Sequence, residues 1–268
     1  KSLFRRPRPP ALFGDPLPWT ELLPHVTAAY GRDPKGLFME IDEHATAAAS
    51  FGQVHRAITA DGEKVAIKIR YPDVDTKLAI DLGVLRFFLP MFNMFVPQAH
   101  FLPIFEEVKR ALLTELDYEQ EARFTEIVHK NFEGTEGIFI PRVIRELTRG
   151  NVICTTWFEG KKITDPALLA DPRMDRRLLL ERVIEAWVKM MYVDGVFQSD
   201  PHPGNLIRTP DGRLAILDFG LMTEVSDDVK YGMVEAIAHL IHRDYEAIVK
   251  DFVTLDFIPS GVDLKPLL

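Results

Sequence analysis

The stretch QSDPHPGNLIRTPDGRLAILDFG, residues 198–220, places an Asp and an Asn five positions apart and ends in Asp-Phe-Gly. In phosphoryl-transfer sites with this spacing, the Asp receives or orients the proton of the attacking hydroxyl, and the Asn and the last Asp hold Mg²⁺ against the phosphates. We therefore interpret Asp200 as the catalytic-loop residue and Asn205 and Asp218 as metal ligands. The His-Arg that usually precedes the first Asp is replaced by Gln198-Ser199.

A lysine stands inside the apolar strand sequence VAIK, residues 65–68. A buried lysine is costly unless it is paired, and in phosphoryl-transfer lobes such a lysine reaches nucleotide phosphates and pairs with a helix glutamate. Strand alternation predicts that Lys68 shares a face with Ala66, opposite Val65 and Ile67. A lysine that extends from an edge strand to water is the alternative.

The segment AAASFGQV, residues 47–54, precedes that strand and ends like a nucleotide-binding loop of the form G-x-G-x-x-G-x-V. Ala47 and Ala49 stand where the first two glycines would be. Because alanine lacks the conformational freedom of glycine, we expect a stiffer, partly helical loop that holds phosphates differently. A plain alanine-rich turn before a strand is the alternative.

Four acids fall within seven residues of TELDYEQEAR, namely Glu115, Asp117, Glu119 and Glu121. On one helix, Glu115 with Glu119 and Asp117 with Glu121 would form mildly destabilising like-charge pairs, so the cluster is expected to need Lys68 or Mg²⁺. Glu115 and Glu121 would lie about 120° apart on a straight helix, so one cation serves both only if the helix bends. A charged solvent face is the alternative.

The hydrophobic patterns predict an α+β fold with two lobes. Residues 1–39 are expected to be a partly helical extension, 40–160 a lobe of strands and helices, and 161–268 a mostly helical lobe with a small hairpin. Within the first lobe, two strands meet at Asp61-Gly62 and helices run from about 74 to 132. Two further strands are expected in IFIPRVIREL and NVICTTWF. A long apolar helix before Gly195 is expected to belong to the core.

The longest uncharged stretch, residues 87–105, contains three prolines, an Asn, a Gln and a His. These residues argue against a regular membrane-spanning helix, so we predict no transmembrane segment. We interpret the stretch as the end of a buried helix, a turn near Pro97 and the start of another helix. An amphipathic patch that faces lipid is the alternative.

Whole-chain properties exclude some functions. The net charge of −8 argues against broad nucleic-acid binding. The single cysteine, Cys154, cannot form an intrachain disulfide, which fits a reducing compartment. His202 has no second His or Cys at ligand spacing, so we expect it to order its loop and not to bind zinc. The chain begins at Lys1 and not at Met, so we expect it to be an excerpt or a processed product.

Six segments together resemble the UbiB family of atypical kinases, in order over residues 40–260: AAASFGQVHRA, VAIKIRYP, ELDYEQEA, WFEG, QSDPHPGN and LDFG. The resemblance implies that Glu121 is the helix partner of Lys68, and that Glu115 and Asp117 form a Glu-x-Asp element that closes over the site. It also implies that adenine binds backbone groups near Thr156 to Phe158. The cofactor contacts it suggests are Ala47, Ala48, Ala49, Ser50, Gln53, Lys68, Glu121, Thr156 and Phe158.

The resemblance further implies a two-lobed kinase-like fold, ATP and Mg²⁺ as cofactors, and a role in isoprenoid-quinone (ubiquinone-type) biosynthesis. A lipid or quinone precursor and peripheral contact with a membrane are the implied partners. The implied location is cytoplasmic or peripheral to a membrane, on the matrix side in an organelle. Two departures stand out: the family's Lys-x-Gly-Gln signature is not in this sequence, and Thr156 stands where an acidic residue is common.

The segment after Asp218 passes almost directly into an amphipathic helix, without the activation loop and Ala-Pro-Glu anchor that seat a peptide. We therefore expect a small-molecule or lipid substrate and not a protein. Two alternatives stay open. One is a nucleotide-gated module that binds a lipid or a protein complex without turnover. The other is a phosphotransferase of the aminoglycoside or choline kinase type.

Overall fold

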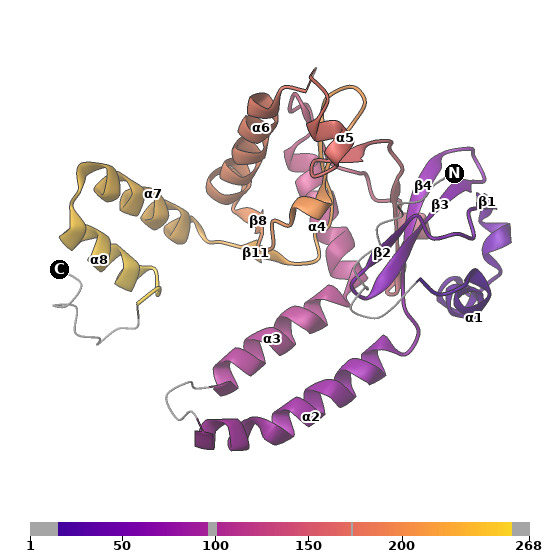
Figure 1. Ribbon diagram of the computed structural model, residues 1–268, viewed down its shortest axis with the longest axis horizontal. Coiled ribbons are helices and arrows are strands. Elements are labelled where there is room, and N and C mark those ends of the chain that lie inside the picture. Colours follow the sequence, from indigo (N-terminus) through magenta and orange to yellow (C-terminus); the bar gives the residue numbers. More distant parts are fainter. Residues whose placement is uncertain (1–15, 96–100, 173, 259–268) are drawn as a thin grey trace. The chain divides into compact units, whose positions relative to one another are not determined.

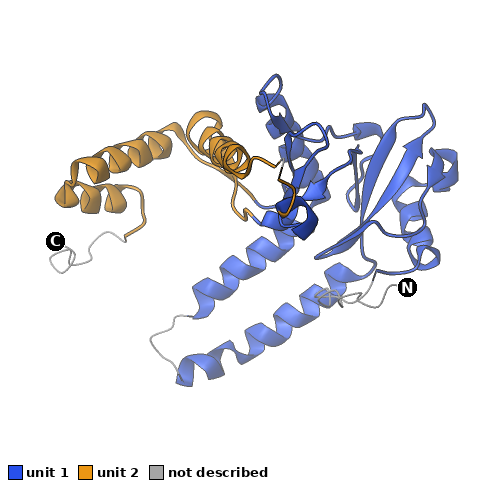
Figure 2. Cartoon of the chain, turned by 45° about the horizontal axis from the view of Figure 1, so that its top comes forward, with its two compact units in different colours: residues 1–169, 202–221 blue, residues 170–201, 222–268 orange. Residues whose placement is uncertain are grey.

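The computed structural model describes residues 16–95, 101–172 and 174–258 (Figure 1). The chain divides into two compact units (Figure 2). Unit 1 comprises residues 1–169 and 202–221, and unit 2 comprises residues 170–201 and 222–268. Helices and mainly antiparallel strands build unit 1, and helices with one short strand pair build unit 2, which confirms the α+β class.

A five-stranded sheet forms the centre of unit 1 (Figure 1). Its order is β1-β3-β4-β6, and β2 pairs with β3; the strands are β1 (Phe38–Ile41), β2 (Ala47–Ala49), β3 (Gly52–Thr59), β4 (Lys64–Arg70) and β6 (Val152–Thr156). The hairpin expected at Asp61-Gly62 joins β3 to β4, and Gly62 takes the positive φ of 88° that this turn requires. Along β4, Val65 and Ile67 are buried while Lys68 lies on the other face, as alternation predicted.

The alanine-rich segment is a strand, so the expectation of a partly helical loop was wrong. Ala47 pairs with Val54 and Ala49 with Gly52, in a tight antiparallel hairpin with β3. The ladder gives the backbone N–H and C=O groups partners that a helical turn of this length could not supply, because a single turn leaves most of them unpaired.

The core of unit 1 lies between the sheet and the helices that cover it. Helix α1 (Trp19–Tyr30) buries Trp19, Leu22 and Val26, which recur at helical spacing, and it ends at Gly31 in the left-handed region. The buried amide of Gln53 on β3 accepts a hydrogen bond from the Leu17 backbone and donates one back to it.

Helices α2 (Val74–Phe95) and α3 (Phe101–Glu115) lie side by side (Figures 1 and 2). One stripe of α2 is buried, comprising Val74, Leu78, Leu82 and Leu89. The rest of its apolar surface is exposed, so the expectation that this helix is buried was wrong: α3 covers only one of its faces. The exposed residues are Ile80, Val84, Leu85, Phe87, Phe88, Met91, Phe92, Met94 and Phe95. The turn expected near Pro97 lies outside the described residues.

Among the described residues, α2 has the length and composition of a helix that could cross a membrane. Its most apolar window has a mean hydropathy of 1.5 and is 11% buried. Core helices of soluble proteins also reach this hydropathy, so a single such helix is weak evidence for a span. The described residues hold no clear transmembrane segment.

The acids of TELDYEQEAR do not share one helix. Helix α3 ends at Glu115, and α4 (Tyr118–Asn131) begins after Asp117, whose side chain caps it by accepting a hydrogen bond from the Gln120 backbone at 3.0 Å. An aspartate at this position satisfies an otherwise unpaired N–H group, so the cap starts a new helix. The like-charge pairs expected along one continuous helix are therefore not present, because the helix is interrupted between Glu115 and Tyr118.

A four-stranded sheet completes unit 1, in the order β5-β10-β9-β7. Its strands are β5 (Ile138–Phe139), β7 (Lys161–Lys162), β9 (Leu206–Arg208) and β10 (Leu214–Ile216). The expected hairpin of β9 and β10 is confirmed. The strand expected in IFIPRVIREL shrinks to β5, followed by a 3₁₀ turn, and α5 (Pro166–Leu169) ends this part of the chain.

The described residues of unit 2 form the strand pair β8 (Val196–Gln198) and β11 (Met222–Glu224), and four helical segments. These are α6 (Arg176–Val188), a π-helical turn η4 (Lys189–Asp194), α7 (Asp227–His242) and α8 (Tyr245–Thr254). Gly195 closes the η4 turn in the left-handed region, as expected for the end of this helix. The helix is not a core helix, however, because Leu180 and Ile184 are more than half exposed.

Candidate functional site

An ion pair between the central sheet and α4 forms the centre of the site. Lys68 Nζ on β4 lies 2.8 Å from both carboxylate oxygens of Glu121 on α4. The side chains are 20% and 7% exposed. The structure thus brings together two of the residues that the sequence named, from positions 53 residues apart.

Neighbouring charges set the protonation of this pair. Burial lowers the pKa of Lys68, but the carboxylates of Glu121 and Asp218 outweigh it and raise the pKa overall, so the lysine stays cationic. Burial raises the pKa of Glu121, and Lys68 opposes that shift. A permanent cation is therefore held in the interior, next to two acids that share it.

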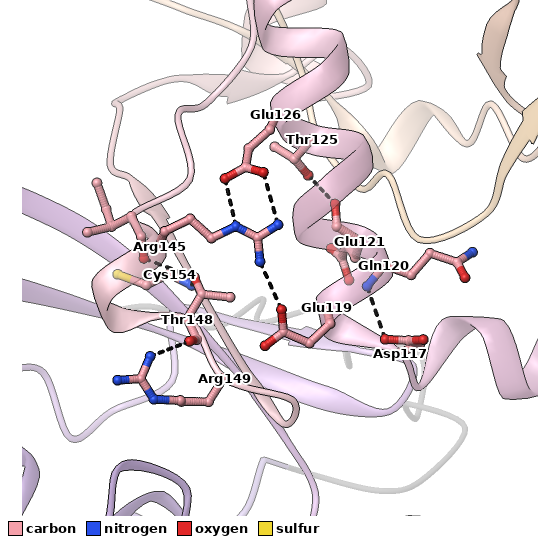
Figure 3. Close-up of polar contacts among 11 residues, drawn as sticks. Asp117, Glu119, Gln120, Glu121, Thr125, Glu126, Arg145, Thr148, Arg149 and Cys154 are labelled. Atoms are coloured by element: carbon pink, nitrogen blue, oxygen red, sulfur yellow. Dashed lines mark hydrogen bonds and ion pairs between the residues drawn. The ribbon is translucent and has the colours of Figure 1, made fainter.

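The sequence around α4 fixes the position of Glu121. Arg70 on β4 donates to the Leu116 carbonyl at 2.6 Å, which ties the end of α3 to the sheet just before the cap at Asp117. On the outer side of α4, Arg145 contacts Glu119 at 2.8 Å and Glu126 at 2.7 Å (Figure 3). The helix is thus anchored at its start and along its outer face, which keeps Glu121 directed at Lys68.

A small cavity lies beside the ion pair, entirely within unit 1. Its volume is about 30 Å³, close to the share of one molecule in liquid water. The residues that line it are Ala49, Ser50, Phe51, Lys68, Glu115, Tyr118, Glu121, Asp218 and Gly220. The turn after β2 thus faces the ion pair across a space that fits a metal ion, a water or one oxygen of a larger ligand.

Asp218 and Asn205 lie together at one side of this site. The Asn205 amide donates to the Asp218 carboxylate at 3.2 Å, and the Gly220 N–H donates to the same carboxylate at 3.3 Å. Asp218 has φ of 65°, in the left-handed region that few non-glycine residues occupy. Strain of this kind often marks residues whose side-chain direction matters. An amide and a carboxylate oxygen are ligands that suit Mg²⁺.

The loop before Asn205 is ordered by His202. The His202 ring accepts a hydrogen bond from the Gly204 N–H at 3.0 Å, so it orders the loop as expected. A Cβ on Gly204 would come within 2.7 Å of that ring, so a side chain there would force the ring to shift. In the described ranges, no group of three or more His, Cys, Asp or Glu residues could hold a metal ion on its own.

Asp200 belongs to unit 2, whereas Asn205 and Asp218 belong to unit 1. It is exposed, and it follows β8 in a segment where the Ser199 and Thr223 hydroxyls are hydrogen-bonded at 2.5 Å. The unit boundary therefore falls inside the D-x-x-x-x-N motif. The distance between Asp200 and Asn205 is still limited by the chain that joins them, because five residues span at most about 17 Å.

The expected adenine segment ends the central sheet. The Thr156 N–H donates to the Arg142 carbonyl, and the Trp157 N–H donates to the Lys64 carbonyl, both at 2.9 Å. The Phe158 ring packs edge-on against Phe139. A backbone N–H donor to a purine in this stretch therefore has to come from Phe158 or a later residue.

Several residues named from the sequence lie away from the cavity. Ala47 and Ala48 are exposed on β2 and do not line it. Gln53 is fully buried on the core side of β3, where its amide contacts Leu17 and lies 2.9 Å from His55. Asp117 caps α4. Of the two acids expected to close over the site, only Glu115 lines the cavity.

Sequence reasoning missed Tyr118 and Phe51 as lining residues. Tyr118 lies inside the ELDYEQEA motif, between the capping Asp117 and Glu121, so its position was a usable signal. The burial of Tyr118 under the β2–β3 turn could not be predicted from the sequence, because this burial depends on the break between α3 and α4. Arg70 was missed for the same reason, since its contact with Leu116 is long-range.

Comparison with known proteins identifies the family. Residues 14–252 match the model of the ABC1 atypical kinase-like domain. The chain is 34% identical over 242 residues to the protein ACTIVITY OF BC1 COMPLEX KINASE 1, chloroplastic, of Arabidopsis thaliana, covering 89% of this chain and 36% of that protein. It is 33% identical over 234 residues to the uncharacterized protein slr1919 of Synechocystis, covering 86% and 41%. The chain thus spans about two fifths or less of these relatives.

A solved structure shares the fold. The complex of Rv3197 with erythromycin, from Mycobacterium tuberculosis, superposes with a TM-score of 0.70 at 25% identity, covering 92% of this chain and 63% of that one. The two-lobed kinase-like fold that the sequence predicted is confirmed. The matched residues include all six segments on which the UbiB resemblance rests, and the chain belongs to the family of ABC1 atypical kinase-like domains.

Proposed function

We propose that the chain binds Mg-ATP and transfers or hydrolyses its terminal phosphoryl group. The observation that carries the proposal is the buried Lys68–Glu121 pair beside Asp218, because this cation, acid and metal-ligand set is what phosphoryl transfer requires. Lys68 would contact the phosphates, and Glu121 would hold the lysine in place.

The residues fit Mg²⁺ bound to phosphate. Asn205 and Asp218 offer oxygen ligands within one hydrogen bond of each other. The neighbouring cavity has room for an ion or a phosphate oxygen. Bound Mg²⁺ would neutralise charge that develops on the transferred group. Asp200, tethered to Asn205 through four residues, would orient the attacking hydroxyl or water.

The acceptor in this proposal is a small molecule, a lipid or water. Only residues 221–226 separate the Asp-Phe-Gly glycine from α7, and three of them form β11. A segment this short has no room for the platform on which kinases seat peptides. The UbiB resemblance supports a role in isoprenoid-quinone biosynthesis, with a quinone precursor as the acceptor. The word chloroplastic in the name of the Arabidopsis relative supports an organellar location.

The test compares ATP turnover by the chain with turnover by Asp218→Asn, with and without lipid vesicles or phenolic quinone precursors. Asparagine tolerates the left-handed backbone, so the fold should persist while the carboxylate is lost. We expect turnover to fall on the order of 10³-fold. Full activity of Asp218→Asn would contradict the proposal.

The two alternatives predict other results in the same assay. Strong thermal stabilisation by ATP without turnover, even with lipid, would favour the nucleotide-gated module. Turnover only with aminoglycosides or choline would favour the other kinase type.

We also propose peripheral membrane contact through α2. Its exposed outer face is apolar over half its circumference, and between Leu82 and Phe95 the only charged residue is Arg86. Exposed apolar patches of this extent mark interaction surfaces. A face with so little charge suits the apolar boundary of a bilayer, where binding scales with buried apolar area.

Vesicle flotation tests this contact with phosphatidylcholine membranes, with and without anionic lipid. Phe87→Ser combined with Phe95→Ser should abolish flotation, because both rings are more than 70% exposed. Met39→Ser removes an equally exposed apolar side chain on β1 and is the matched control. Binding that high salt removes would indicate an electrostatic contact and contradict the apolar one.

A further inference from the structure

The hydroxyl of Tyr118 is buried without a hydrogen-bond partner. Tyr118 is the first residue of α4 and is 1% exposed, and no described residue accepts from or donates to its hydroxyl. A buried hydroxyl left unpaired costs about 1–3 kcal/mol. An unpaired buried hydroxyl within the ELDYEQEA motif indicates that a bound ligand supplies its hydrogen-bond partner.

The position of the hydroxyl indicates what that partner is. Tyr118 lines the cavity beside the ion pair. A Cβ on Gly52 would come within 2.7 Å of the hydroxyl oxygen, so this oxygen lies directly under the turn between β2 and β3. Lys68 Nζ lies 4.9 Å from the centre of the Tyr118 ring. Tyr118 and Lys68 therefore line the same small space.

The hydroxyl is suited to donate a hydrogen bond to a ligand oxygen. Both oxygens of Glu121 are already bonded to Lys68, so this nearest carboxylate is engaged elsewhere. Burial raises the pKa of Tyr118, so the phenol keeps its proton and acts as a donor at any physiological pH. The space of about 30 Å³ beside the hydroxyl fits one phosphate oxygen.

We propose that Tyr118 is a nucleotide-binding residue whose hydroxyl donates to a phosphate oxygen of a bound nucleoside di- or triphosphate, beside Lys68. The assignment rests on the proposed function and adds a residue to it. The turn after β2 then covers the phosphates with backbone, and Tyr118 contacts them from below.

Calorimetry with Mg-ADP and with adenosine tests the assignment on Tyr118→Phe, which removes only the hydroxyl oxygen. Hydrogen bonds to charged groups contribute about 1.5–3 kcal/mol, so the Kd for Mg-ADP should rise about tenfold or more. The Kd for adenosine should stay unchanged, because adenosine has no phosphate. The melting temperature without ligand should not fall, because the hydroxyl has no partner to lose.

Tyr71→Phe is the matched control. Tyr71 is also buried, and its hydroxyl also has no partner among the residues that the structure describes, but it does not line the cavity. Its removal should leave the Kd for Mg-ADP unchanged.

The outcomes separate the two claims. Wild-type protein that binds no nucleotide would overturn the proposed function, and the Tyr118 assignment with it. Wild-type binding that Tyr118→Phe leaves intact would overturn the assignment alone. If Tyr118→Phe did not fold, a structure of the wild-type chain with Mg-ADP decides instead. A hydroxyl farther than about 3.5 Å from every phosphate oxygen would overturn the assignment.

Discussion

Key carboxylates of unit 1 and unit 2 lie in different environments. In unit 1, Glu121 is nearly buried, paired with Lys68, and packed beneath a covering turn. In unit 2, Asp200 is exposed on a loop that follows a three-residue strand. The groups expected to hold the nucleotide are thus built into one core, while the group expected to act on the acceptor is carried by the other unit. Binding and turnover should therefore be separable by mutation.

The largest expected effect separates these two roles. Asp200→Asn should lower turnover on the order of 10²-fold, because general-base assistance is lost, while the Kd for Mg-ATP stays within about twofold. Lys68→Ala should weaken both turnover and Mg-ATP binding, because the role we propose for its cation is to contact the phosphates. Turnover assays and calorimetry on both variants provide the measurement. Equal loss of nucleotide affinity in Asp200→Asn and Lys68→Ala would contradict the assignment of nucleotide binding to unit 1 alone.

A second prediction concerns stability. Glu121→Gln leaves a buried lysine without its main partner, which should lower the free energy of unfolding by about 3 kcal/mol. The value is at the lower end of the usual range because Asp218 still offers a negative charge. Denaturant unfolding followed by fluorescence measures it.

The control for this prediction lies in unit 2. Arg177 and Glu181 are 2.8 Å apart but largely exposed, so Glu181→Gln should change stability by no more than about 0.5 kcal/mol. Similar losses of unfolding free energy for Glu121→Gln and Glu181→Gln would show that burial does not make the ion pair of unit 1 more important for stability than that of unit 2.

The smallest expected effects are on pH dependence, and they have opposite signs in the two units. In unit 1, burial lowers the pKa of His55, although the Asp42 carbonyl and carboxylate oppose this. Its contribution to stability is therefore present above pH 6.5 and is lost as the pH falls toward the depressed value. In unit 2, the Asp251 carboxylate at 2.7 Å raises the pKa of His239. That contribution is present below pH 6.5 and is lost as the pH rises through the raised value.

Hydrogen exchange between pH 5 and 8, read separately for β3 and for the α7–α8 pair, would detect both trends. His55→Gln should flatten the first trend and His239→Gln the second. A trend of the same sign in both units, or one that neither substitution alters, would contradict this assignment.

Local patterns indicated much of the candidate site. The spacing of Asp200, Asn205 and Asp218 and the strand lysine are local features, and they pointed to phosphoryl transfer before any contact was known. The β3–β4 hairpin was also predictable, because alternation and an Asp-Gly turn specify it within some twenty residues. Patterns failed where exposure decided the outcome: the apolar sequence of α2 is equally compatible with a buried core helix and with one covered on a single face.

Sequence alone determined the family, the identity of the motif residues and the order in which they occur. Only the tertiary structure decided that the alanine-rich segment is a strand and that Asp117 starts a new helix. It also decided that the Tyr118 hydroxyl, under the Gly52 turn, has no partner within residues 16–95, 101–172 and 174–258. Each of these depends on contacts between residues far apart in the chain or on a single capping hydrogen bond. Propensities and periodicities describe neighbours along the chain, so they contain no information on which distant side chain will complete a buried site.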